Sequence, residues 1–114
     1  MNTGTQASLS TFWKARTTTS PGGKTEERRN FALIMAVHKA NYVATASVGY
    51  LRDLRKKFRR ASEMNGFRFI HVHTPCPPGW KFPSEKTVEV ARKAVMSGAW
   101  ILFEEDWELL LKFF

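Results

Sequence analysis

Three segments of the chain carry apolar residues at the three- and four-residue spacing of an amphipathic helix. The first begins after Arg29 and predicts a short helix of about ten residues. The second is surrounded by basic side chains. The third begins at Ser84 or Thr87, each a suitable N-cap, and runs through Met96 to a stop at Gly98. The predicted apolar stripes are, in order, Phe31, Ile34, Met35 and His38; Leu51, Leu54, Phe58 and Ala61; and Val88, Ala91 and Val95.

Between these helices, runs of β-branched and aromatic residues predict strands. Residues 42–47 (YVATAS), 67–74 (FRFIHVHT) and 100–103 (WILF) are the three candidates, and residues 106–114 fit either a strand or a helix. Strands that alternate with helices predict an α/β fold built from βαβ units around a parallel sheet. Since three strands make a thin sheet whose two faces both need cover, we expect only part of a doubly wound parallel sheet. The second strand is ended directly by Pro75, Pro77, Pro78 and Gly79.

The chain divides into an irregular part and a regular part. Residues 1–28 hold ten Ser and Thr and three Gly with almost no apolar periodicity, and Ser20-Pro21-Gly22-Gly23 predicts a turn. A loop of this length is uncommon in a compact domain unless it binds something or covers a partner. We therefore expect a loop of the active-site type over 1–28, and an incomplete α/β domain over 29–114.

Composition and charge narrow the classes of protein. The 114 residues suit one domain, and 43% hydrophobic with 25% charged residues is close to the average for globular proteins. No signal peptide or membrane span is predicted, so we expect a cytoplasmic protein with no membrane partner. The net charge of +8 is concentrated in one helix. That basic stripe indicates either a solvated helix face or a surface that attracts nucleic acid, an anionic membrane or an acidic partner subunit, and a small nucleic-acid-binding module is one alternative function. Its members are Arg52, Arg55, Lys56, Lys57, Arg59 and Arg60.

A few residues carry candidate chemistry. One cysteine excludes an intramolecular disulfide. His71 and His73 share a strand face with Cys76 just beyond, which fits either a zinc site or two packed histidines. Cys76 itself could be a nucleophile, a metal or cluster ligand, or an inert thiol. Asn2-Thr3-Gly4 could cradle an anion or a polar ligand, or be an ordinary chain terminus.

Several stretches together resemble the β subunits of the 2-oxoacid:ferredoxin oxidoreductases, the family that includes pyruvate synthase. They occur in the family's order and extend over nearly the whole chain, in the part that is C-terminal in those subunits. The stretches are Met1-Asn2-Thr3-Gly4 with Gln6, Thr17-Thr18-Thr19-Ser20-Pro21 with Lys24, residues 42–47, Phe69-Ile70-His71-Val72-His73, Pro75-Cys76-Pro77-Pro78-Gly79-Trp80, and Thr87-Val88-Glu89-Val90-Ala91.

The resemblance implies a fold, a reaction and a site. The fold is the thiamine-diphosphate-binding type, and the reaction is oxidative decarboxylation of pyruvate with coenzyme A to acetyl-CoA and carbon dioxide, with electrons passed to ferredoxin. Asn2 matches a catalytic asparagine whose amide reaches the reacting carbon, and Thr3, Gly4 and Gln6 stand with it in the cofactor-binding stretch. Cys76 matches one ligand of the iron–sulfur cluster nearest the thiamine.

The same resemblance implies that this chain alone is incomplete. In the family the magnesium ligands and the other cluster cysteines lie upstream of the Asn-Thr-Gly stretch. We therefore expect an isolated chain without activity and without bound thiamine diphosphate, Mg²⁺ or cluster. The expected partners are an N-terminal half of the β subunit, subunits of the α, γ and δ types, ferredoxin, pyruvate and coenzyme A. A branched substrate of the 2-oxoisovalerate type remains an alternative to pyruvate.

This sequence also departs from the family pattern. Residues 12–16 (FWKAR) stand where the family usually has Pro-Tyr-Gly-Ala-Trp, so Lys14 and Arg16 bring two charges into the loop. Leu51 replaces the proline that usually follows Gly49-Tyr50.

Overall fold

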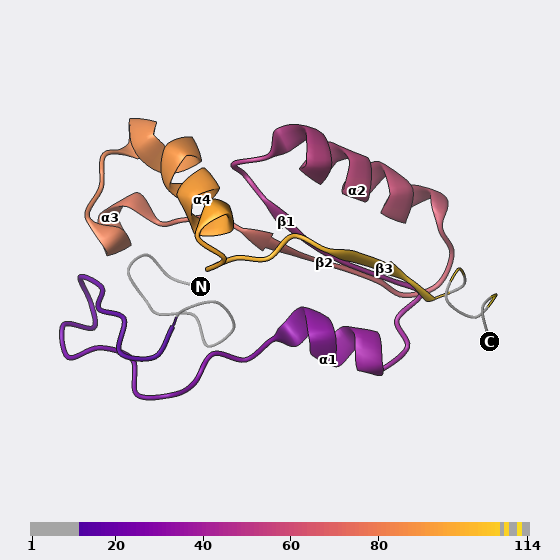
Figure 1. Ribbon diagram of the computed structural model, residues 1–114, viewed down its shortest axis with the longest axis horizontal. Coiled ribbons are helices and arrows are strands. Elements are labelled where there is room, and N and C mark those ends of the chain that lie inside the picture. Colours follow the sequence, from indigo (N-terminus) through magenta and orange to yellow (C-terminus); the bar gives the residue numbers. More distant parts are fainter. Residues whose placement is uncertain (1–11, 108, 110–111, 113–114) are drawn as a thin grey trace.

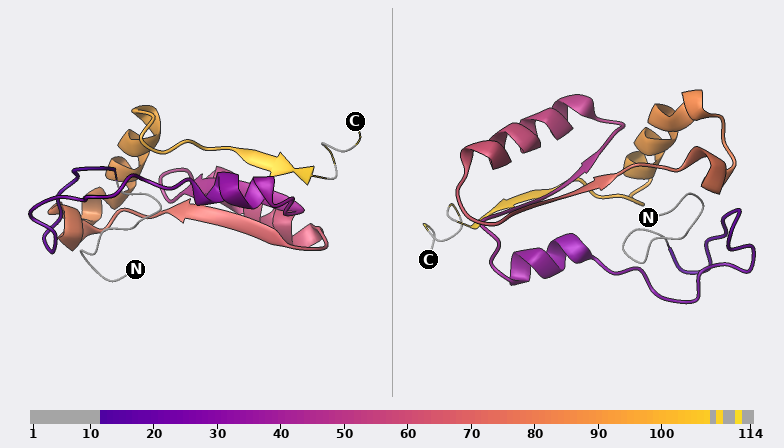
Figure 2. Two further views of the ribbon diagram at one scale, coloured as in Figure 1. Left: turned by 90° about the horizontal axis from the view of Figure 1, so that it is seen from below. Right: turned by 180° about the vertical axis from the view of Figure 1, so that it is seen from behind.

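The computed structural model describes residues 12–107, 109 and 112, which form a small sheet with helices on both faces (Figure 1). Helix α1 lies on one face and α2 on the other, while α3 and α4 lie beyond one end of the strands (Figures 1 and 2). The elements are α1 (Phe31–Val37), β1 (Tyr42–Ser47), α2 (Leu51–Glu63), β2 (Arg68–His73), α3 (Pro77–Trp80), the 3-10 helix η1 (Ser84–Lys86), α4 (Thr87–Met96) and β3 (Glu104–Asp106).

The sheet is mixed, with strand order β2-β1-β3. β1 and β2 are parallel, with Tyr42 opposite Arg68 and Ser47 opposite His73, and α2 connects them as a βαβ unit. The predicted parallel arrangement is thus confirmed for this pair. It is wrong for β3, which runs antiparallel to β1. The reason is the position of α4: it lies at the carboxyl ends of the strands, so the chain that leaves it runs back toward their amino ends (Figure 1). A doubly wound sheet of the thiamine-diphosphate-binding type therefore stays a prediction.

The third strand is displaced from its predicted position. Residues 100–103 were expected to form it, yet β3 begins at Glu104. Thr45 of β1 explains the shift, because its hydroxyl donates to Ile101 O at 2.6 Å and accepts from Phe103 N at 2.9 Å. Its backbone N donates to Phe103 O at 3.0 Å. The Thr45 side chain thus takes two hydrogen bonds that a regular ladder would supply, and residues 101–103 lie beside β1 outside the regular β1–β3 ladder.

The core consists of two layers of small side chains, one on each face of the sheet. Val43 packs with α1, while Tyr42 and Ala44 pack with α2, so β1 is buried on both sides, as expected of this β-prone run. β1 has the predicted bounds, and β2 and α4 lie within theirs. Of the ten buried hydrophobic residues in the described chain, seven are alanines, which let the helices lie close to the sheet: Ala32, Ala36, Ala40, Ala44, Ala46, Ala61 and Ala91.

The predicted helix after Arg29 exists, but a different side of it is buried. α1 buries Ala32 and Ala36, with Met35 partly buried, whereas Ile34 and His38 of the predicted stripe are exposed. A short helix that packs on a flat sheet gains most from small residues at the contact. Leu33, Ile34 and Val37 therefore remain exposed.

Helix α2 also differs from its prediction, because a cation occupies its buried side. Lys57 is 4% exposed, and its Nζ lies 2.7 Å from Asp53 Oδ2 and donates to Thr45 O at 2.9 Å. Arg60 pairs with Asp106 at 3.1 Å and with Glu104 at 3.4 Å, which joins α2 to β3. The basic stripe is therefore not one solvated face. Two of its six cations bind carboxylates of this chain.

No helix among the described residues has the length and apolar character that a membrane span requires.

Candidate functional site

The irregular segment before α1 folds into a loop held by its own backbone. Lys14 N donates to Lys24 O at 2.9 Å, and Lys24 N donates to Ala15 O at 3.0 Å. The predicted turn is confirmed, since Gly23 N donates to Ser20 O at 3.1 Å. Gly23 has a φ of +88°, and a Cβ there would lie 2.8 Å from Lys14 O, so only glycine fits without strain. The loop is thus a defined structure.

This loop docks on the segment that follows β2. Thr18 N donates to Gly79 O at 3.0 Å, which joins the loop to α3. Two of the stretches that carry the family resemblance, Thr17–Pro21 and Pro75–Trp80, are therefore in contact although about 60 residues separate them. They meet beyond the carboxyl ends of the two parallel strands, the edge where open α/β sheets bind ligands. This contact is the candidate functional site.

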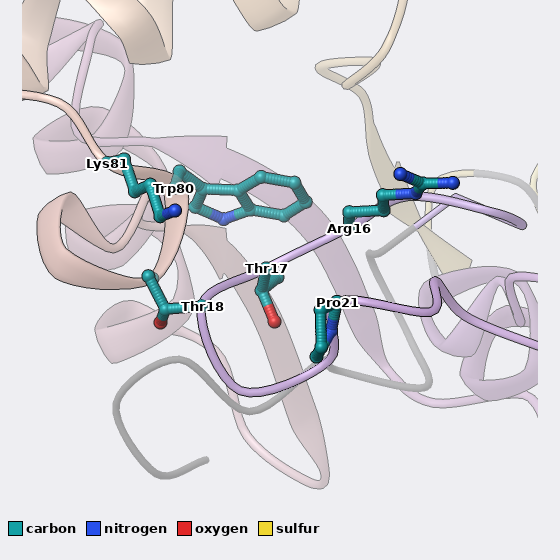
Figure 3. Close-up of a pocket in the computed structure, with 7 residues that line it drawn as sticks. Arg16, Thr17, Thr18, Pro21, Trp80 and Lys81 are labelled. Carbon is teal, nitrogen blue, oxygen red and sulfur yellow. The ribbon is translucent and has the colours of Figure 1, made fainter.

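A pocket of about 280 Å³ lies in the contact. Figure 3 shows the Trp80 indole in its wall, with Lys81 on one side of the ring and Arg16 on the other. Lys81 has a left-handed backbone, with φ +56°, that ends α3. No carboxylate is among the lining residues, so cations, hydroxyls and an indole give the pocket a chemistry suited to an anionic or polar group. The described lining is Arg16, Thr17, Thr18, Pro21, Gly79, Trp80 and Lys81.

Cys76 is the N-cap residue of α3 and directly precedes this pocket wall. Its thiol is free and half-buried, and its backbone O accepts from Trp80 N at 3.0 Å. Pro75 and Pro77 flank it and fix the backbone at the end of β2. Within the described part of the chain, no three His, Cys, Asp or Glu side chains come together as a metal site. These residues thus offer one sulfur ligand and do not form a complete metal or cluster site.

The two strand histidines are part of an aromatic cluster instead. The ring centroids of His71 and Trp100 lie 4.9 Å apart in an edge-on arrangement, and His73 stacks on Trp100 at 5.3 Å. Trp100 Nε1 donates to Ala46 O at 2.9 Å and fixes the indole. Both histidines therefore share a face, as predicted, but among the described residues they do not join Cys76 in a zinc site. The packed-histidine interpretation is the one that the geometry supports.

Burial sets the electrostatics of this pair. Burial lowers the pKa of His71. The pKa of His73 is lowered mainly by burial and to a smaller extent by the nearby His71, because both effects disfavour a charged imidazole. His73 Nδ1 is buried and has no hydrogen-bond partner within the described residues. The environment of both rings therefore favours the neutral imidazole.

The residues that depart from the family pattern have local partners. Lys14 Nζ lies 4.2 Å from the Trp13 ring centroid, and the Arg28 guanidinium lies 4.3 Å from that of Phe12. These cation–π contacts hold the charges of the loop beside aromatic rings. Leu51 is the first residue of α2, a position where proline is also tolerated.

The structure leaves part of the predicted site undescribed and adds residues to it. Asn2, Thr3, Gly4 and Gln6 lie outside the described residues, so their roles stay predictions. Trp80 was recognised only as part of a motif, and Lys81 was not recognised at all. Nor was Trp100 expected to cover the histidines. No local spacing indicates contacts between segments so far apart in sequence.

Comparison with known proteins gives close relatives for most of the chain. No protein-family model matches it. It is 52% identical over 109 residues to pyruvate synthase subunit PorB of Methanothermobacter thermautotrophicus, 45% identical over 111 residues to the β subunit of NADH-dependent phenylglyoxylate dehydrogenase of Aromatoleum evansii, and 42% identical over 111 residues to ketoisovalerate oxidoreductase subunit VorB of Pyrococcus abyssi. These matches include 91%, 91% and 93% of this chain, but only 38%, 25% and 36% of the relatives.

Proposed function

Because this chain belongs to the family of 2-oxoacid:ferredoxin oxidoreductase β subunits, we propose that it works as part of a pyruvate synthase β subunit. The reaction is oxidative decarboxylation of pyruvate with coenzyme A to acetyl-CoA and carbon dioxide, with electrons passed to ferredoxin. The observation that carries this proposal is the match to pyruvate synthase PorB at 52% identity over 91% of the chain. The contact between the 12–28 loop and the Cys76 segment supports it, because both belong to stretches that resemble the family.

In this proposal the chain's own residues hold and orient the reacting groups. The Asn2 side-chain amide donates a hydrogen bond to negative charge that develops on the substrate oxygen, a role an amide performs without titrating. Thr3, Gly4 and Gln6 belong to the same stretch of the resemblance and would hold thiamine diphosphate with Mg²⁺, which would supply carbanion chemistry. An iron–sulfur cluster with Cys76 as one ligand would supply one-electron redox chemistry. In this proposal the magnesium ligands come from the rest of the β subunit, as the family resemblance implies.

Two observations support the proposal that Cys76 is a cluster ligand. Its thiol is half-buried at the carboxyl edge of the sheet, and the flanking prolines fix its backbone. One thiolate cannot hold a cluster, so the remaining cysteines come from elsewhere in the complex. The partners in this proposal are the rest of the β subunit, subunits of the α, γ and δ types, and ferredoxin.

A chimeric subunit tests the proposal. This chain replaces the matching 109 residues of the Methanothermobacter thermautotrophicus subunit, which is produced with its partner subunits. We expect pyruvate-dependent reduction of ferredoxin. Cys76→Ser should lower the iron content and the visible absorbance of the cluster, whereas Thr74→Ser, a matched change at an exposed position on the same segment, should leave both unchanged. Asn2→Ala should lower kcat while the iron content stays constant.

Two results would contradict the proposal. A chimera that assembles with its cluster but reduces no ferredoxin with any 2-oxoacid would exclude the activity. An unchanged iron content in Cys76→Ser would exclude the ligand role of this cysteine alone. Activity with 2-oxoisovalerate in place of pyruvate would support the alternative substrate, which the VorB relative favours by its name.

The isolated chain should not carry out this reaction. The proposal gives it one cluster ligand and an incomplete cofactor site, so it should bind neither thiamine diphosphate nor a cluster tightly. Isothermal titration of the 114-residue chain with thiamine diphosphate and Mg²⁺ measures this directly. Micromolar binding would show that the chain contains a complete cofactor site.

A further inference from the structure

The outer side of α2 carries four cations on one face. Arg52, Arg55, Lys56 and Arg59 fall at positions i, i+3, i+4 and i+7, which places them side by side on the helix. All four are exposed. Helix α2 covers one face of the sheet (Figures 1 and 2), and at its start Leu51 and Arg52 line a pocket together with Val88 and Arg92 of α4. None of the four forms an ion pair with a described residue.

The carboxylates nearest to this helix are bound to its two inner cations. Asp53 is held by Lys57 at 2.7 Å. Glu104 and Asp106 of β3 are both held by Arg60. The remaining acid on α2 is Glu63 at its last position, so the outer side keeps a net positive charge. This chain therefore supplies cations to the outer side but few anions to balance them.

Such an arrangement is unfavourable for an isolated helix. Like charges three and four residues apart repel one another. Arg52 also lies in the first turn, where the helix dipole disfavours a cation. Carboxylates supplied from outside would remove both penalties, which makes the outer side of α2 complementary to an acidic surface.

Two apolar side chains lie beside the cations and indicate the class of partner. Leu51 is 54% exposed and Phe58 is 49% exposed, and both border the row of cations on the same helix. A phosphate backbone makes little use of such side chains, whereas protein interfaces combine apolar contacts with charged ones. We propose that this surface, the α2 basic surface, docks an acidic surface of a partner protein; it consists of Leu51, Arg52, Arg55, Lys56, Phe58 and Arg59.

Three labelled probes of equal charge test the proposal on the full 114-residue chain. They are a glutamate-only peptide, a peptide in which leucine and phenylalanine alternate with glutamate, and an oligothymidylate. Binding is measured by fluorescence anisotropy at low salt. Arg55→Gln/Arg59→Gln removes two cations from the α2 basic surface. Arg29→Gln/Lys112→Gln, at exposed positions elsewhere, lowers the net charge by the same amount.

We expect the mixed peptide to bind more tightly than the other two probes. Arg55→Gln/Arg59→Gln should weaken its binding about tenfold, and the control pair less than about threefold. Phe58→Ser should lower its affinity to that of the glutamate-only peptide. Equal losses in the two double variants, or absence of binding by the mixed peptide, would overturn the proposal. Tighter binding of oligothymidylate with no effect of Phe58→Ser would overturn it in favour of nucleic acid.

Discussion

Replacing Asp53 with alanine should destabilise the chain more than replacing its partner Lys57 with methionine. Lys57 is almost completely buried on the side of α2 that faces β1. Its ammonium has two close acceptors, Asp53 Oδ2 at 2.7 Å and Thr45 O at 2.9 Å. Asp53→Ala leaves a buried ammonium with one neutral acceptor. Lys57→Met removes the charge itself and keeps most of the side-chain volume, while the remaining carboxylate still has access to water.

The structure sets the size of the two effects. Removing one member of a fully buried ion pair costs about 3–5 kcal/mol. Because the Asp53 side chain is 35% exposed, water replaces part of the lost interaction, and we expect about 2 kcal/mol for Asp53→Ala. Lys57→Met loses two hydrogen bonds but also the cost of burying a charge, so we expect about 1 kcal/mol or less.

Urea unfolding of the 114-residue chain, followed by circular dichroism, measures both values. With a slope of about 1.3 kcal/mol per molar urea, Asp53→Ala should lower the midpoint by about 1.5 M, and Lys57→Met by about half of that or less. Glu89→Ala is the matched control: it removes a carboxylate from two exposed ion pairs, with Lys86 and Lys93, and should change the midpoint by less than about 0.5 M. An equal or larger loss for Lys57→Met would refute the idea that the unpaired ammonium dominates the cost.

Three further predictions concern the frame around the site. Gly66→Ala should cost about 1–3 kcal/mol in urea unfolding, because its φ of +84° is left-handed and a Cβ there would overlap the Asn41 side chain; Gly98→Ala, also left-handed but in open space, should cost less. Stability should fall as the pH drops from 7 to about 5.5, because the unfolded chain binds protons at His71 and His73 more readily than the folded chain does, and a pH-independent midpoint in this range would contradict that. Tyr42→Phe removes a hydroxyl that donates to a carboxylate of β3 at 2.7 Å and should cost about 1–2 kcal/mol, while hydrogen exchange of β3 should quicken relative to that of β2.

The sequence predicts the elements of this fold better than it predicts their contacts. β1 has the predicted bounds because residues 42–47 are a short run of β-prone residues, and β2 ends where prolines forbid its continuation. The direction of β3 could not be predicted from the sequence, because it depends on where α4 lies relative to the sheet. The burial of Lys57 was hidden for a similar reason: its two acceptors include a backbone oxygen of β1, which no helical periodicity reveals.

In the candidate site, too, the segments could be predicted from the sequence but the contact between them could not. Its two stretches, the 12–28 loop and the Cys76 segment, were both found from the sequence as separate motifs. Their contact through Thr18 N and Gly79 O joins segments about 60 residues apart, and backbone groups carry no signature of their partner in a single sequence. The shared face of His71 and His73 was predictable, because side chains two apart on a strand point the same way.

The alanines between the helices and the sheet decide which mutations this chain can accept. In a core of leucines, damage comes from truncation, which leaves a hole. Here there is little to truncate, and an added methyl group at Ala44, which is fully buried between β1 and α2, must push the helix away from the strand. Random mutagenesis of this protein should therefore find its most sensitive interior positions among the buried alanines, where even a substitution by valine lowers the stability of the fold.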